Sequence, residues 1–159
     1  MNFSITSKMT KPEYIKVMYI GLYKKPSFII STVFGLCLLT IVFLDYLTIT
    51  KFLDGQPFYY IICGVFLVFS PTLIVMMAVN QLKSNPSFLN EITYTFNEEK
   101  ILVEGITFKS ELTWAHILKQ KEIGGFLILY HTKKFGNFID KAKLLPEQLL
   151  FIKEKVLSK

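Results

Sequence analysis

The chain has 159 residues, of which 52% are hydrophobic and only 19% are charged, whereas an ordinary soluble domain carries about 25% charged residues. This length allows one small domain, with or without an appendage. The net charge of +6 comes from 18 lysines without any arginine, and this composition argues against sequence-specific nucleic-acid binding, because arginine's planar fork is the usual reader of phosphates and guanine edges.

The first 27 residues are predicted to form a cytoplasmic segment. Thr10, Lys11, Pro12 and Glu13 match a capping box with proline in the first turn. An amphipathic helix is expected to follow, up to the lysines at 24 and 25. This helix could lie on the inner headgroup surface or pack on the C-terminal domain. The alternation at residues 3–7 is also compatible with an extra edge strand.

Two apolar blocks predict a transmembrane hairpin over residues 28–79, with spans at 28–49 and 58–79. Both cysteines, Cys37 and Cys63, fall inside these blocks, which excludes a disulfide framework or a zinc site. Small residues are expected to let the two helices approach closely, namely Ser27, Ser31 and Gly35 on the first helix and Gly64 and Ser70 on the second.

Lysine counts predict the orientation of the hairpin. Five lysines precede the first span, the connection carries only Lys51, and twelve lysines follow the second span. The positive-inside rule therefore places both termini in the cytoplasm of a multi-pass protein of the inner (cytoplasmic) membrane. Lys24, Lys25 and Lys83 flank the spans on the inner side, where they are predicted to set the topology and to contact lipid headgroups. Pro71 is expected to kink the second helix.

Residues 88–159 predict a cytoplasmic domain of five to seven short antiparallel strands with a C-terminal helix. Strands are expected around 92–96, 101–103, 116–121, 126–130 and 138–139, and a hairpin turn at 97–100. The clearest alternation places Ile106, Phe108, Leu112 and Trp114 on one inward face. The final helix is expected to begin near Pro146 and to bury a stripe formed by Leu145, Leu149, Ile152 and Val156. The fold class is therefore an α+β membrane protein with a small antiparallel β domain.

This layout resembles the YcxB-like family of bacterial membrane proteins. The resemblance rests on the hairpin, on Tyr94-x-Phe96 and on Leu112-x-Trp114-x-x-Ile117, which are followed by an aromatic-ended strand and a terminal helix. It implies a C-terminal domain similar to pleckstrin-homology (PH) domains and no transferable catalytic residue. The chain departs from the family at residues 139–141, where Ile-Asp-Lys replaces Ile-Pro-Lys.

No motif predicts catalysis, a cofactor or a metal ion. His116 and His131 have no metal-ligand spacing, and Glu98 with Glu99 fits a solvated turn. The sequence therefore predicts a non-enzymatic, membrane-tethered interaction module, whose partners are membrane lipids and a protein or peptide, with no nucleic acid. A homo-oligomer is left open. The alternative function is immunity or self-protection against a membrane-active peptide, with the outer connection at 51–56 as the working part.

Overall fold

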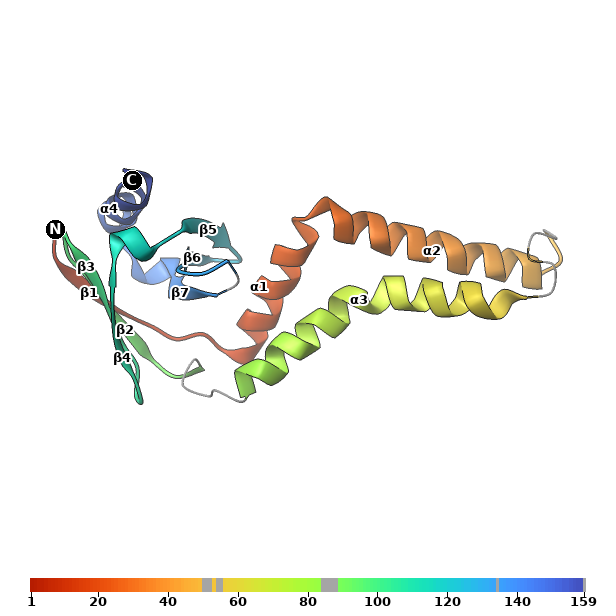
Figure 1. The fold of residues 1–159 in the computed structure, drawn as a ribbon, viewed down its shortest axis with the longest axis horizontal. Helices are drawn as coiled ribbons and strands as arrows, with labels where there is room; N and C mark the ends of the chain where they lie inside the picture. Colours follow the sequence, from red (N-terminus) through yellow and green to blue (C-terminus); the bar gives the residue numbers. More distant parts are fainter. Residues whose placement is uncertain (50–52, 54–55, 84–88, 134, 159) are drawn as a thin grey trace. The chain divides into compact units, whose positions relative to one another are not determined.

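The structure is a computed structural model that describes residues 1–49, 53, 56–83, 89–133 and 135–158. The fold is α+β, and its chain order is shown in Figure 1. Two compact units are present. Residues 1–17 and 79–159 form one of them, called here the β domain, and residues 18–78 form the other, called the helical unit.

The first sheet of the β domain combines one strand that precedes the helical unit in the chain with three strands that follow it. Its four antiparallel strands lie in sequence order, and they are β1 (Phe3–Ser7), β2 (Ile92–Phe96), β3 (Lys100–Glu104) and β4 (Lys109–Thr113). β1 pairs with β2 from Phe3 opposite Phe96 to Ser7 opposite Ile92. The predicted edge strand is confirmed, and the chain leaves this sheet after Ser7 and returns to it at Ile92.

The second sheet contains three antiparallel strands, β5 (Lys119–Ile123), β6 (Phe126–Tyr130) and β7 (Gly136–Asp140). The strand expected at 116–121 begins later than predicted. Trp114–His116 instead form a short 3-10 helix, η2, in which Thr113 Oγ1 lies 3.0 Å from His116 Nδ1. The turn between β5 and β6 uses Gly124 and Gly125 at φ 59° and 89°, a region that suits glycine.

The hydrophobic core lies between the two sheets and the C-terminal helix. The residues with almost no exposure come from both sheets, from Ile117 and from Ile152 of the helix, and those in the sheets are Tyr94, Phe96, Ile101, Val103, Leu127, Leu129 and Ile139. Trp114 is also buried, and its indole Nε1 donates to the Asn97 carbonyl at 2.9 Å. The hairpin turn predicted at 97–100 is confirmed, with Asn97 Oδ1 accepting from the amide of Lys100 at 2.7 Å.

The C-terminal helix α4 (Pro146–Leu157) is tied to both sheets by ion pairs. Lys153 lies 2.6 Å from Glu122 of β5, which also pairs with Lys141. Lys155 lies 2.6 Å from Glu98, in the turn between β2 and β3. These hydrogen bonds lower the pKa of both glutamates to about 2, the first cause being Lys141 for Glu122 and Lys155 for Glu98.

Two predicted core positions are wrong. Ile106 is 72% exposed, because β3 ends at Glu104 and the chain turns before β4 begins at Lys109. Leu145 is 62% exposed at the N-cap of α4, where it precedes the helical stripe. Phe151 and Leu144 pack against the core in addition to the predicted Leu149, Ile152 and Val156.

Candidate membrane-anchoring site

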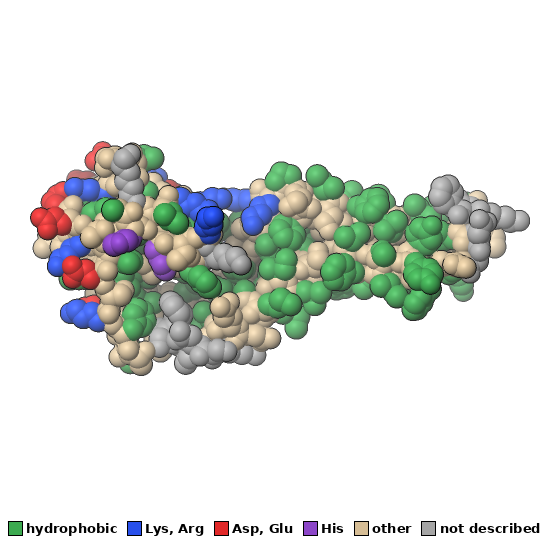
Figure 2. All heavy atoms as spheres, viewed as in Figure 1, with side chains coloured by type: hydrophobic (Ala, Val, Ile, Leu, Met, Phe, Trp, Pro, Cys, Tyr) green, Lys and Arg blue, Asp and Glu red, His purple; other side chains and the backbone are tan. Residues whose placement is uncertain are grey.

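The helical unit contains two helices that are long and apolar enough to cross a membrane. They are α2 (Pro26–Tyr46) and most of α3 (Pro57–Lys83). The 21 residues of α2 span about 31 Å, which matches a hydrocarbon core of about 30 Å. Only 6% of the most apolar stretch of α2 and 17% of that of α3 are buried, which is unlike the core helix of a soluble protein. Figure 2 shows hydrophobic side chains over most of the visible face of this hairpin.

The two helices that contain the predicted spans have somewhat different bounds from those spans. The first helix starts two residues earlier than predicted, with Pro26 in its first turn, and it ends at Tyr46. Leu47 caps it, and Thr48 has a φ of 60°, which leaves the helical conformation. The second helix begins at Pro57 and continues past residue 79 to Lys83. Proline suits these starts because its missing N–H is unpaired in the first turn anyway.

Helices α2 and α3 approach each other closely at Gly35 and Gly64. A Cβ built on Gly35 would lie 2.9 Å from the Gly64 carbonyl oxygen and 2.9 Å from Leu67 Cβ. A Cβ on Gly64 would lie 2.8 Å from Leu39 Cγ. The predicted role of these two glycines is confirmed. Ser27 is exposed, however, so the small-residue contact does not extend to the start of α2.

The polar groups in the middle of α3 have partners within the helical unit. Ser70 Oγ donates to the Leu67 carbonyl at 3.0 Å, and Thr72 Oγ1 accepts from the Tyr19 hydroxyl at 3.1 Å. Pro71 between them is buried, and the ribbon of α3 bends near its middle (Figure 1). The bend agrees with the predicted kink, since proline removes a helix hydrogen bond and crowds the preceding turn.

Helix α1 (Lys11–Tyr23) contributes to both units. Its capping box is confirmed, because Glu13 Oε2 accepts from the amide of Thr10 at 2.8 Å, and hydrogen bonds from Thr10 lower the pKa of Glu13. Within the β domain, the Tyr14 ring meets Phe138 of β7 edge to face at 5.9 Å. Of the two placements predicted for this segment, packing on the domain therefore holds for its first half. Within the helical unit, the Tyr19 hydroxyl bonds Thr72, a contact that no sequence signal indicated.

The predicted lipid-contacting lysines occupy the ends of the helices. Lys24 and Lys25 are exposed in the junction between α1 and α2, where Lys25 is the N-cap of α2. The Lys25 ammonium lies 6.0 Å from the centre of the Phe28 ring. Lys83 is the last residue of α3, and its side chain lies outside the described part of the chain. The structure thus brings Lys24 and Lys25 together next to the start of the first apolar helix.

The sequence prediction missed a basic surface at one end of the second sheet. The lysines Lys119 and Lys121 lie in register with Tyr130 and Ile128, so all four side chains share one face. The ammonium group of Lys119 lies 4.9 Å from the centre of the Tyr130 ring. The i, i+2 spacing of the two lysines was the available signal, but only the strand register shows which face they occupy.

The two histidines lie in different surroundings. The His116 Nδ1 accepts from the amide of Thr113 at 3.2 Å. The Nδ1 of His131 is buried without a hydrogen-bond partner among the described residues, and burial lowers the pKa of His131. In the described ranges, no three His, Cys, Asp or Glu side chains are grouped so that they could hold a metal ion.

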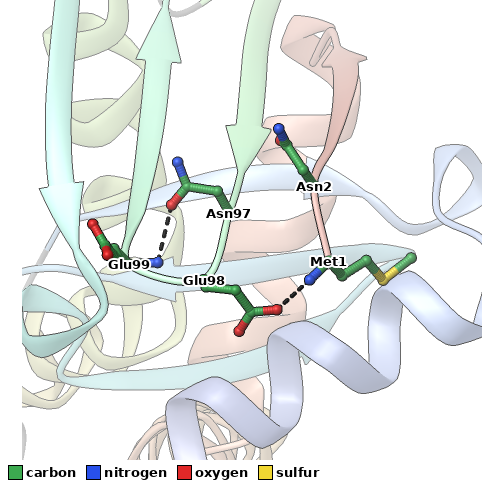
Figure 3. A pocket seen from close by; sticks show the side chains of 5 residues that line it. All are labelled: Met1, Asn2, Asn97, Glu98 and Glu99. Atoms are coloured by element: carbon green, nitrogen blue, oxygen red, sulfur yellow. Dashed lines mark hydrogen bonds and ion pairs between the residues drawn. The ribbon is translucent and has the colours of Figure 1, made fainter.

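An open hollow of about 360 Å³ lies beside the turn between β2 and β3 (Figure 3). It is lined by Met1, Asn2, Asn97, Glu98 and Glu99. Its Glu98 carboxylate already pairs with the Met1 amine and with Lys155, so that charge is engaged within the fold.

Comparisons with protein-family models, with curated proteins and with solved structures found no match.

Proposed function

We propose that the chain is a membrane-tethered, non-enzymatic interaction module of the cytoplasmic membrane. In this proposal α2 and α3 cross the bilayer as a hairpin, and the β domain is a PH-like domain that binds a protein or peptide partner at the inner surface. Tethering raises the local concentration of membrane partners to the millimolar scale, so that even a weak binding site becomes occupied.

The observation that carries the proposal is the uncovered apolar surface of the hairpin. Side chains such as Ile30, Phe34, Phe66 and Met77 are each more than half exposed, and α2 and α3 continue such surface along their length. Soluble monomers rarely leave contiguous apolar patches of this extent in water. In a bilayer this apolar surface would contact lipid and not water. The helical hairpin also keeps its backbone hydrogen bonds internal, as a spanning segment must.

The arrangement of the β domain supports a PH-like fold. A four-stranded and a three-stranded antiparallel sheet enclose one core, and a C-terminal helix packs on it. The hairpin is inserted between β1 and β2, which are neighbours in the first sheet. The resemblance to the YcxB-like family likewise implies a two-helix hairpin followed by a C-terminal PH-like domain.

The orientation rests on charge. Lys24 and Lys25 precede α2, and Lys83 ends α3, whereas the connection between the spans carries one lysine. We therefore place both termini in the cytoplasm. The alternative function, self-protection against a membrane-active peptide, depends on the connection at 51–56, most of which lies outside the described residues.

Alkaline extraction of membranes tests the anchor. The full-length chain should stay in the membrane pellet at high pH and should be released only by detergent. A chain that is monodisperse in plain buffer without detergent would overturn the proposal.

Site-specific photo-crosslinking in native membranes tests the binding role. A crosslinker on the exposed Ile106 turn of the β domain should capture a discrete protein partner, whereas one at the lipid-facing Phe34 should not. Capture through Phe34 alone would favour a hairpin-based function instead.

A further inference from the structure

Strand β4 is an open edge of the first sheet. It is the last strand in the order β1-β2-β3-β4, and among the residues that the structure describes it pairs with β3 alone. The edges at β1 and β5 have neighbours, because Ser7 of β1 hydrogen-bonds Asp140 of β7 and Glu122 of β5 pairs with Lys153 of α4. An open edge offers a row of backbone groups to any further strand that can align with it.

The turn before β4 shows which backbone groups of this strand face outward. The Gly105 amide donates to the Phe108 carbonyl at 2.8 Å, so these two residues form a hydrogen-bonded pair. Along an antiparallel ladder such pairs recur at every second residue. The N–H and C=O groups of Lys109 and Glu111 therefore point away from β3, toward the open edge.

The side chains of β4 divide between the two faces of the sheet. Phe108 and Leu112 pack partly against the core, and Ser110 lies between them on the same face. Lys109 and Glu111 occupy the other face and are exposed. The strand is therefore self-complementary about Ser110, because unlike charges lie one residue away on either side and apolar side chains lie two residues away.

One antiparallel register of two β4 strands opposes unlike charges. A twofold axis at Ser110 places Lys109 opposite the partner's Glu111, and Glu111 opposite the partner's Lys109. An axis at residue 109 or at residue 111 would place that residue opposite its own copy, and like charges directly opposite one another destabilise a sheet. The axis at Ser110 also brings Phe108 opposite the partner's Leu112.

We propose that two copies of the chain form a homodimer through β4, in which their first sheets join into one sheet of eight strands with twofold symmetry. The outward backbone groups of Lys109 and Glu111 bond those of the partner's Glu111 and the partner's Lys109. Within one chain, Lys109 already pairs with Glu104. Lys100 lies 2.9 Å from Glu111. The exposed face of the joined sheet then carries alternating charges, in the order Glu104, Lys109, the partner's Glu111 and the partner's Lys100.

The pairing gives the edge lysine a role that differs from its usual one. Lysine on an edge strand commonly discourages contact with another chain. In this dimer Lys109 favours the contact, because the partner's Glu111 lies where its ammonium group arrives. The pairing uses only the β domain, and it therefore stands independently of the proposed membrane anchor.

Disulfide crosslinking of the full-length chain in detergent micelles tests the dimer. In a background of Cys37→Ala and Cys63→Ala, Ser110→Cys places a thiol on the twofold axis. Residue 110 then faces its own copy in a non-hydrogen-bonded pair, in which the Cα atoms lie about 4.5 Å apart, a separation that a disulfide can bridge. Mild oxidation should convert most of the chain into a linked dimer. Ser4→Cys, at an exposed position on the opposite edge strand β1, is the matched control and should stay monomeric.

Charge exchange in the Ser110→Cys chain separates pairing from the loss of an ion pair within the domain. Lys109→Glu and Glu111→Lys each oppose like charges in their own homodimer. An exposed cross-strand charge pair changes an equilibrium constant by about twofold, so converting two attractive pairs into two repulsive pairs should weaken either homodimer on the order of tenfold. A mixture of the two variants, one with a longer affinity tag, should restore a crosslinked dimer of mixed size, because each variant supplies the charge that the other lacks. Near-UV circular dichroism checks that both variants keep the fold.

The outcomes decide the proposal. Preferential crosslinking of Ser110→Cys over Ser4→Cys, with recovery in the mixture, supports the dimer through β4. Equal crosslinking of the two cysteine variants, or folded charge variants that fail to recover when mixed, refutes it. A dimer held by α2 and α3 alone would not respond to the charge exchange and would likewise refute pairing through β4. Neither readout depends on a bilayer, so failure here leaves the membrane anchor in place.

Discussion

The contact between Gly35 and Gly64 should make the hairpin sensitive to a single side chain. A Cβ at position 35 would lie 2.9 Å from the Gly64 carbonyl oxygen and 3.0 Å from Val68 Cγ2, whereas ordinary contact begins at 3.4 Å. The helices must therefore separate locally by about 0.5 Å for alanine, and by more for leucine. Because a carbonyl oxygen cannot turn away as a flexible side chain can, the adjustment has to come from the backbones.

The expected cost follows from overpacking, which typically destabilises by about 1–3 kcal/mol. Gly35→Ala should lie near the lower end, because alanine recovers up to about 1 kcal/mol of helix propensity. Gly35→Leu should reach about 2–3 kcal/mol. We therefore expect leucine at position 35 to destabilise the hairpin more than alanine does. Helix propensity alone would not produce this order of destabilisation, because both residues exceed glycine in propensity.

Unfolding of the full-length chain in mixed micelles, followed by far-UV circular dichroism during titration with sodium dodecyl sulfate, measures the effect. Cys37→Leu is the matched control, because Cys37 lies two residues along the same helix with an exposed side chain. It should change the free energy of unfolding by less than about 0.5 kcal/mol. Equal midpoints for Gly35→Leu and Cys37→Leu would refute the close crossing.

Three further predictions follow from contacts in the β domain and from the proposed topology. As the pH falls from about 4.5 toward 2, the packing of α4 on the domain should weaken, because protonation of Glu122, whose folded pKa is lowered to about 2, removes its ion pair with Lys153. Glu122→Gln should abolish this acid-dependent change in a titration followed by near-UV circular dichroism. Ser7→Ala should cost about 1–3 kcal/mol in chemical unfolding, because the buried Ser7 Oγ accepts from the partly buried amide of Asp140 at 2.9 Å, whereas substitution of the exposed Ser4 by alanine should change little. A membrane-impermeant label on a cysteine at position 54 should react from outside the cell, and reaction only from the cytosol would reverse the proposed orientation.

Because the hairpin is inserted between β1 and β2, the stability of the β domain should depend on the N-terminal strand. β1 contributes Ile5 to the core and pairs with β2 along its whole length. Ser7 of the same strand hydrogen-bonds Asp140 of β7, so this strand also contacts the second sheet. A deletion of the first ten residues should therefore unfold the β domain, and not merely shorten a tail.

Local sequence patterns determined most of the elements. The two apolar blocks, the capping box at Thr10 and the turn at Asn97 depend on composition and on contacts three or four residues apart, and the structure contains each of them. Gly35 and Gly64 were also predictable, because two apolar helices joined by a short connection can approach closely only at small side chains.

Tertiary structure decided the features that depend on pairing between distant segments. Alternation alone placed Ile106 inside, but the turn after Glu104 leaves it 72% exposed. The face occupied by Lys119 became known only from its register with Tyr130. The hydrogen bond from Tyr19 to Thr72 likewise joins residues 53 positions apart. A sequence pattern reports the period of an element, whereas the partner and the exposed face are set by packing against residues that are remote in the chain.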